Sequence, residues 1–133
     1  MARFDPSGVD SVTYAPIALI DQRDSQWKDV RLSFDAWDWL AEQLGSEVGE
    51  AYVDDYYLNG YGVQGLVQAC RLSAGLNVEA EGIDYDSEGD TCFIHFSRLE
   101  DAIETAQLAA EMLKDRAKIV AMVQVARENG LED

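Results

Sequence analysis

The chain has 133 residues, which suits one domain with its own core, and it carries a formal net charge of −16 at pH 7. Such an acidic chain repels nucleic acid and anionic membranes, so the charge argues against both and favours basic proteins or cations as partners. We find no basic, apolar leader and no apolar run long enough to span a bilayer, and therefore expect a cytoplasmic, single-domain protein over residues 1–133. Two cysteines in apolar surroundings, Cys70 and Cys92, favour reduced thiols over a disulfide.

The first half of the chain predicts one strand and one short helix. We expect residues 1–12 to be loosely ordered. Residues 13–20 predict a strand, and Pro16 restricts it to a sheet edge or to a start at Ile17. Apolar residues recur at helical spacing over residues 34–44, with Ser33 as the N-cap, so we predict a helix there. Trp39 lies off this apolar stripe, and we expect it to pack rather than to serve as an exposed anchor.

The second half alternates helices with a pair of strands. The connection over residues 45–62 is rich in glycine, acids and tyrosine, and long ordered loops in small domains are often functional. A helix follows over residues 63–74, and then strands over 78–85 and 91–96 flank an acidic turn. Ser97 and Glu100 form a capping box before a C-terminal helix that either runs through Arg127 or bends near Lys114 into a second helix.

These elements predict an α+β fold. We expect a small, mostly antiparallel sheet covered by helices on one face, with a long C-terminal helix or helix pair. The two strands around the acidic turn form the centre of this predicted sheet.

The acidic turn places four carboxylates in seven residues, at Asp84, Asp86, Glu88 and Asp90, shortly before the only histidine, His95. The spacing matches the first half of a calcium-binding EF-hand loop, but His95 stands where its last glutamate belongs and the flanks read as strands. Zinc would need more nitrogen or sulfur ligands than one histidine and two separated cysteines. Cys92 and His95 should point to opposite faces of a strand, which argues against a catalytic pair. We therefore expect no metal, no cofactor and no catalytic residue.

Recognition of a partner is the remaining use for these residues. Carboxylates can steer a basic protein toward the surface, and aromatic side chains can anchor it there. The predicted partner-binding residues are the four acids of the turn and a second patch in the long connection: Asp54, Asp55, Tyr56 and Tyr57. Solvated turns with buried aromatics explain the same residues nearly as well.

Two short motifs resemble the immunity protein 51 family of bacterial polymorphic-toxin systems. One is Asn59-Gly60-Tyr61-Gly62 at the start of a helix, and the other is Asp86-Ser87-Glu88 between two strands. The family tends to have tryptophan after the Asn-Gly-Tyr motif and proline within the acidic motif; this chain has Val63 in place of the tryptophan and Ser87 in place of the proline. The resemblance covers roughly the last two thirds of the chain. It implies a cytoplasmic protein that binds and neutralises a cognate toxin and catalyses no reaction.

The hypothesis that follows is an immunity protein whose acidic surface docks onto the basic cleft of a toxin, for example a nuclease. Gly60 and Gly62 would let the chain turn tightly into the helix, and Tyr61 would pack on the sheet. One alternative is a small ligand-binding or enzymatic domain with a pocket near His95. Another is a structural subunit that dimerises through residues 119–126. The sequence leaves open whether the protein is a monomer or a homodimer, and which toxin it binds.

Overall fold

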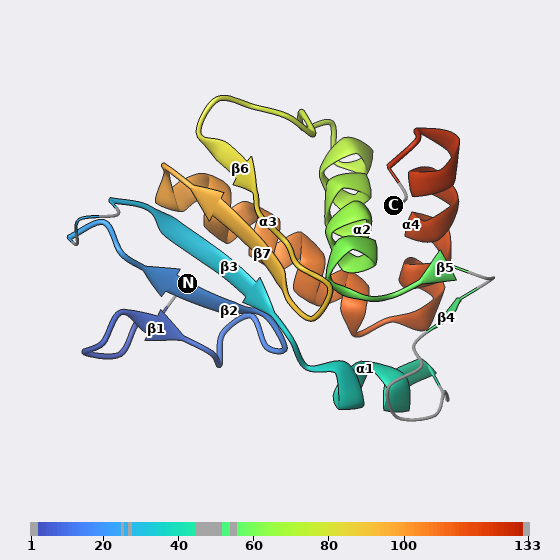
Figure 1. Ribbon diagram of the computed structural model, residues 1–133, viewed down its shortest axis with the longest axis horizontal. Helices are drawn as coiled ribbons and strands as arrows, with labels where there is room; N and C mark the ends of the chain where they lie inside the picture. The colour runs from blue at the N-terminus through green and yellow to red at the C-terminus, as the bar shows by residue number, and fades with distance from the viewer. Residues whose placement is uncertain (1–2, 25, 27, 45–51, 54–55, 132–133) are drawn as a thin grey trace.

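The structure of the protein, a computed structural model, describes residues 3–24, 26, 28–44, 52–53 and 56–131. Its main sheet is antiparallel, with strands β1 (Val9–Asp10), β2 (Ala18–Asp21), β3 (Val30–Phe34), β7 (Cys92–Phe96) and β6 (Ile83–Tyr85) in that order (Figure 1). The helices are α1 (Trp37–Leu44), α2 (Gly60–Ser73), α3 (Leu99–Leu113) and α4 (Arg116–Glu128). A short hairpin of β4 (Tyr52–Val53) and β5 (Tyr56–Tyr57) precedes α2. The predicted α+β class is confirmed.

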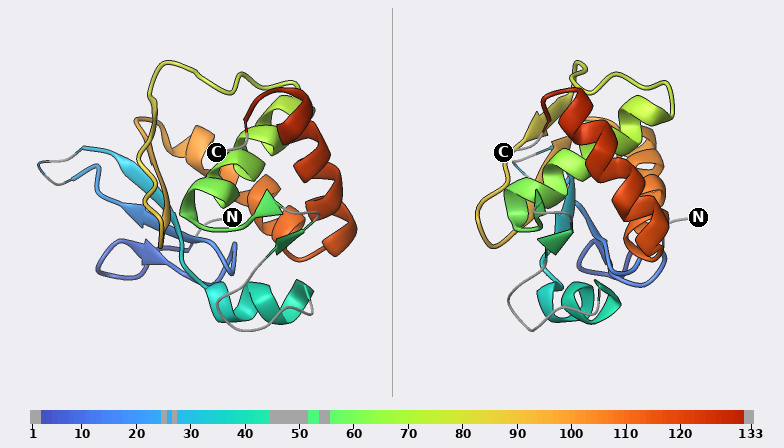
Figure 2. Two further views of the ribbon diagram at one scale, coloured as in Figure 1. Left: turned by 45° about the vertical axis from the view of Figure 1, so that its right-hand side comes forward. Right: turned by 90° about the vertical axis from the view of Figure 1, so that its right-hand side faces the viewer.

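The core lies between one face of the sheet and the helices. Figure 2 shows α2, α3 and α4 gathered on one side of the sheet, and α3 contacts β2, β3 and β7. The central strands β3 and β7 bury every second residue, and their register pairs Val30 with Phe96, Leu32 with Ile94 and Phe34 with Cys92. Since paired residues share a face, these six side chains form one layer beneath the helices. None of the helices in the described part of the chain covers the opposite face of the sheet.

The strand β3 was missed in the sequence, and part of it was assigned to a helix. Ser33 and Phe34 belong to β3, so Ser33 is not a helix cap, and α1 begins only at Trp37. The segment Val-Arg-Leu-Ser-Phe alternates apolar and polar residues with a period of two, which is the pattern of a half-buried strand. The apolar residues that follow at helical spacing masked this signal. Trp39 packs partly buried against the core, as expected.

The other strands are shorter or begin elsewhere than predicted. Residues 1–12 were expected to be loosely ordered. This expectation is wrong for Val9 and Asp10, which form β1 and pair with β2. The strand predicted over residues 13–20 is β2, and residues 13–16 form turns before it. The strand predicted over 78–85 is reduced to β6, because residues 78–82 form bends and turns. The prediction that both strands around the acidic turn form the centre of the sheet is wrong, because β6 is an edge strand and β3 lies at the centre.

The C-terminal region is a pair of helices that separate at Lys114 and Asp115. Asp115 adopts an extended backbone conformation and its carboxylate accepts a hydrogen bond from the N–H of Ala117, so it caps α4. The capping box predicted for α3 is wrong, because Arg98 holds the N-cap position and makes no side-chain cap bond. Within the described residues, no helix has the length and apolar character needed to cross a bilayer.

Candidate functional site: an acidic hairpin held by two helices

The predicted acidic residues lie together on the hairpin that joins β6 to β7. We call residues 84–90 the acidic hairpin. Its four carboxylate side chains, those of Asp84, Asp86, Glu88 and Asp90, are all exposed. The N–H of Glu88 donates to the Thr91 carbonyl at 2.9 Å, which closes the turn. The structure therefore brings these four predicted site residues together on one short segment.

Hydrogen bonds from two helices fix the backbone of the acidic hairpin. The indole N–H of Trp37, at the start of α1, donates to the Asp90 carbonyl at 2.7 Å. The first residue of α2, Gly60, donates its N–H to the Gly89 carbonyl at 3.1 Å. One turn later, the side-chain oxygen of Gln64 accepts from the N–H of Ser87 at 3.3 Å. The turn that carries the acids is thus bound to the body of the protein at three places.

Gly60 is the point of closest approach between α2 and the hairpin. A Cβ atom on Gly60 would lie 1.7 Å from the Glu88 carbonyl oxygen and 2.6 Å from that of Thr91. Only glycine lets two backbones approach this closely. Asn59 caps the helix beside it, since its side-chain oxygen accepts from the N–H of Gly62 at 2.8 Å. Gly60 was predicted to let the chain turn tightly into the helix, whereas the feature that the structure shows at this position is the close approach of its backbone to the hairpin.

The tyrosine-rich patch differs from the expectation. Tyr56 is 4% exposed, and its hydroxyl donates to the Gly62 carbonyl at 3.0 Å, so it supports α2 and is not available to anchor a partner. Tyr61 is 40% exposed, so the prediction that it packs on the sheet is wrong. Asp54, Asp55 and the side chain of Tyr57 lie outside the described residues.

A second polar cluster occupies the helix-free face of the sheet. The Nδ1 atom of His95 lies 2.8 Å from a carboxylate oxygen of Asp29, whose other oxygen accepts from the Arg31 guanidinium at 3.1 Å. On the other side of the ring, Nε2 lies 3.4 Å from the Asp86 carboxylate. His95 also lines an open depression of about 400 Å³ with Asp29 and Asp84. This arrangement links one acid of the hairpin to β3.

The sequence reasoning missed Asp29 and Arg31. They lie on or next to the overlooked strand β3, whose register places Arg31 opposite His95. The period-two pattern over residues 30–34 was the signal that could have placed Arg31 on this face. In contrast, the predicted opposition of Cys92 and His95 is confirmed, because Cys92 is fully buried under the helices and His95 lies on the other face. Across the described residues, no group of histidine, cysteine and acidic side chains has the geometry of a metal site.

The two thiols are free and buried. Burial raises the pKa of Cys70 to about 12, although the nearby Lys118 ammonium acts in the opposite direction. Burial likewise raises the pKa of Cys92 to about 12, against a smaller opposing effect of its hydrogen bond with Ser87. Both thiols are therefore protonated and poorly nucleophilic near neutral pH.

Comparison with family models, with curated proteins and with solved structures gave no match to this chain.

Proposed function

We propose that this protein is an immunity protein that binds and neutralises a cognate toxin domain through the acidic hairpin. The observation that carries the proposal is a set of four exposed carboxylates on a backbone held by Trp37, Gly60 and Gln64. A surface that is fixed before binding loses less conformational entropy when a partner docks. The acids are therefore suited to direct recognition of a basic surface.

The charge of the hairpin is largely available for a partner. Within the described residues, Asp84, Glu88 and Asp90 form no salt bridge, and Asp86 has only the 3.4 Å contact with His95. A protein of net charge −16 attracts basic partners over a distance of about 10 Å at moderate ionic strength. The basic cleft of a nuclease toxin is the kind of surface that such carboxylates would occupy, in place of the nucleic-acid phosphates.

The resemblance to the immunity protein 51 family gains structural meaning from one contact. Its two motifs are separated by about two dozen residues of sequence, yet Gly60 of the first donates a hydrogen bond to Gly89, next to Glu88 of the second. Gln64, on the first turns of the same helix, holds Ser87 of the second motif. If folding requires this contact, each motif depends on the other, which would explain why both occur in one chain.

The test is binding to the toxin domain encoded beside this protein. Purified wild-type protein is titrated against that toxin domain by isothermal calorimetry. Association rates are then measured between 50 and 500 mM salt, a range over which the Debye length falls about threefold. We expect a tight complex whose association slows steeply with salt, because charge complementarity acts mainly on the on-rate.

Two charge-matched variants identify the surface. The first changes the hairpin acids to amides: Asp84→Asn, Asp86→Asn, Glu88→Gln and Asp90→Asn. The second removes the same charge from exposed glutamates on the helices: Glu42→Gln, Glu104→Gln, Glu111→Gln and Glu128→Gln. We expect the hairpin variant to lose at least a hundredfold in affinity and the helix variant less than tenfold, with circular dichroism showing both folded. Equal losses would refute the hairpin as the binding surface, and failure of the folded wild-type protein to bind would refute the immunity role.

The cluster around His95 favours a second candidate, a small ligand-binding or enzymatic domain. Asp29 holds Nδ1 of His95 at 2.8 Å, an arrangement that orients a histidine for proton transfer through Nε2. Nε2 faces Asp86 and the ring lines the depression with Asp84, so a cationic ligand would be the fitting class. The calorimetric titration with the toxin domain separates the two candidates. If the hairpin carboxylates alone account for toxin binding, His95→Gln should leave the affinity for the toxin nearly unchanged.

The dimerising-subunit alternative receives no comparable support. The apolar residues Ile119, Val123 and Ala126 of α4 are buried within the protein, and α4 contacts α2. The exposed part of this helix mixes Arg116, Lys118 and Gln124 with Ala117, Val120 and Ala121, so polar and charged side chains interrupt its exposed apolar residues.

A further inference from the structure

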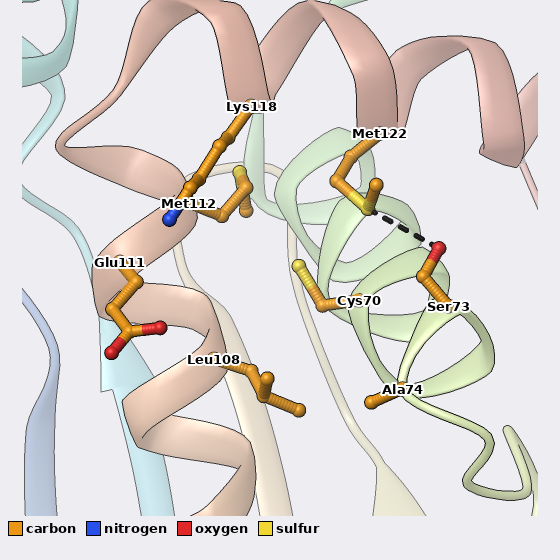
Figure 3. Close-up of a pocket in the computed structure, with 8 residues that line it drawn as sticks. All are labelled: Cys70, Ser73, Ala74, Leu108, Glu111, Met112, Lys118 and Met122. Carbon is orange, nitrogen blue, oxygen red and sulfur yellow. Dashed lines mark hydrogen bonds between the residues drawn. The ribbon is translucent and has the colours of Figure 1, made fainter.

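A groove lies among α2, α3 and α4, on the helical side of the protein. Figure 3 shows its lining side chains, which come from all three helices. Its volume is about 340 Å³, at the lower end of the range for small-molecule sites. Most of the lining is apolar, from Cys70 on α2 and its C-cap residue Ala74, Leu108 and Met112 on α3, and Met122 on α4. It uses none of the residues of the acidic hairpin.

The floor of the groove consists of uncharged, largely apolar side chains that can adapt their shape. Cys70 is 7% exposed and Met112 is 2% exposed, so both belong to the core, whereas Leu108 and Met122 are half-buried at its sides. Methionine side chains adapt their shape to an apolar ligand because they are unbranched and polarisable. The Ser73 hydroxyl is already engaged with the Met122 sulfur at 3.7 Å. Little in the floor calls for a polar ligand group.

The mouth of the groove carries one cation and one anion. Lys118, near the start of α4, and Glu111, on α3, are both exposed, and neither forms a salt bridge with a described residue. The Lys118 ammonium is the charge whose field acts on the Cys70 thiol at the floor. Lys118 lines the same pocket as Cys70 and Met112, so its ammonium can bind the head of a molecule whose tail lies on these two residues.

We propose that this groove binds a medium-length alkyl carboxylate, with the chain along Cys70, Met112 and Met122 and the carboxylate on Lys118. At about 30 Å³ for each heavy atom, which is the share of a water molecule in the liquid, the groove accommodates about eleven heavy atoms. Decanoate has about this size, since two of its twelve heavy atoms are the carboxylate oxygens, which lie at the mouth. Burying the chain supplies the affinity, and Lys118 supplies the preference for an anion. This site is independent of the proposed toxin binding.

The test uses decanoate as the probe and the methionine methyl groups as reporters. The protein is labelled with ¹³C at its methionine methyls, and the signals of Met112 and Met122 are assigned with Met112→Leu and Met122→Leu. We expect saturable shifts of both signals below the micelle concentration, with a Kd on the order of 100 µM. Decan-1-ol and decylammonium, which have the same chain, should each bind about tenfold more weakly. Absence of a saturable shift with decanoate, or equal binding of decylammonium, would overturn the proposal.

Variants separate the roles of the charge and the cavity. Lys118→Met keeps an apolar stem and should reduce decanoate binding to the level of decan-1-ol, whereas Lys114→Met, which removes an exposed charge outside the groove, should change it less than twofold. Glu111→Gln should strengthen binding two- to threefold by removing a repelling carboxylate. Ala74→Trp fills the groove from an exposed position and should abolish the shifts while circular dichroism shows a folded protein. Decanoate binding that survives Ala74→Trp would place the ligand elsewhere and refute the site.

Discussion

Replacement of Gly60 by alanine is the sharpest test of how the acidic hairpin is held. The new Cβ would lie 1.7 Å from the Glu88 carbonyl oxygen, whereas real Cβ atoms essentially never come closer than 3.0 Å, so the two backbones must separate by at least the difference, about 1.3 Å. Because both atoms in conflict belong to or adjoin the main chain, no side chain can rotate away to relieve the contact. The separation also breaks the 3.1 Å hydrogen bond from Gly60 to Gly89.

These terms set the expected cost. Overpacking costs about 1–3 kcal/mol, and loss of the hydrogen bond costs about 1 kcal/mol. Alanine regains up to about 1 kcal/mol through its higher helix propensity. The last two terms nearly cancel, so we expect Gly60→Ala to lower the free energy of unfolding by about 1–3 kcal/mol. For a chain of this length the melting temperature should fall by about 4–12 °C.

Urea denaturation followed by circular dichroism measures this loss, and two other glycines provide controls. At Gly89 a Cβ meets no atom within 4 Å, so Gly89→Ala should change stability by less than about 0.5 kcal/mol. At Gly75 the space is also open, but φ is +79°, so Gly75→Ala should cost about 1 kcal/mol through backbone strain alone. If Gly60→Ala were no less stable than Gly89→Ala, the close approach of α2 to the hairpin would be refuted.

Three further outcomes follow from the contacts of individual side chains. Trp37→Phe retains an aromatic ring but loses the hydrogen bond to the Asp90 carbonyl, so unfolding in urea should become easier by about 1 kcal/mol, and unchanged stability would argue against this bond. Burial by itself raises the pKa of Asp10, but hydrogen bonds from backbone N–H groups outweigh it and lower the pKa to about 2. Since this pKa is lower in the folded than in the unfolded chain, the carboxylate contributes stability above about pH 4 that is lost as the pH falls toward 2, and Asp10→Asn should flatten the pH dependence of unfolding in that window. Burial raises the pKa of both Cys70 and Cys92 to about 12, so neither thiol should react with a thiol reagent at pH 8 until urea unfolds the protein, and rapid labelling of the native protein would contradict their burial.

Local patterns in the sequence predicted several elements well. The helical spacing before Gly75 and after Leu99 corresponds to α2 and α3, and the strand that contains His95 is β7. Prediction failed where two patterns overlapped, as at Phe34, whose apolar side chain fits both the end of β3 and a helical stripe leading into α1. The burial of Tyr56 also escaped prediction, because an aromatic residue in a loop has the same local signature whether it packs or remains exposed.

The candidate site was visible in part. The exposed acids could be found because four carboxylates in seven residues are conspicuous in any chain. The hydrogen bonds that hold the hairpin could not be predicted. Gly60 and Trp37 are separated from the hairpin by many residues, and nothing in the local sequence indicates that they contact it. The same is true of Asp29, which lies 66 residues before His95 in the chain and 2.8 Å from its ring.

The sequence by itself determined the strong acidity, the α+β class and the concentration of carboxylates between two strands, because composition and the short periods of helices and strands are local properties. Only the tertiary structure decided that the acidic hairpin rests on Gly60 and Trp37, that His95 meets Asp29, and that a groove with Lys118 at its mouth lies among three helices. These features depend on strand register and on the packing of distant segments. Each of these contacts forms because the whole apolar core is buried cooperatively, and no local sequence pattern contains that information.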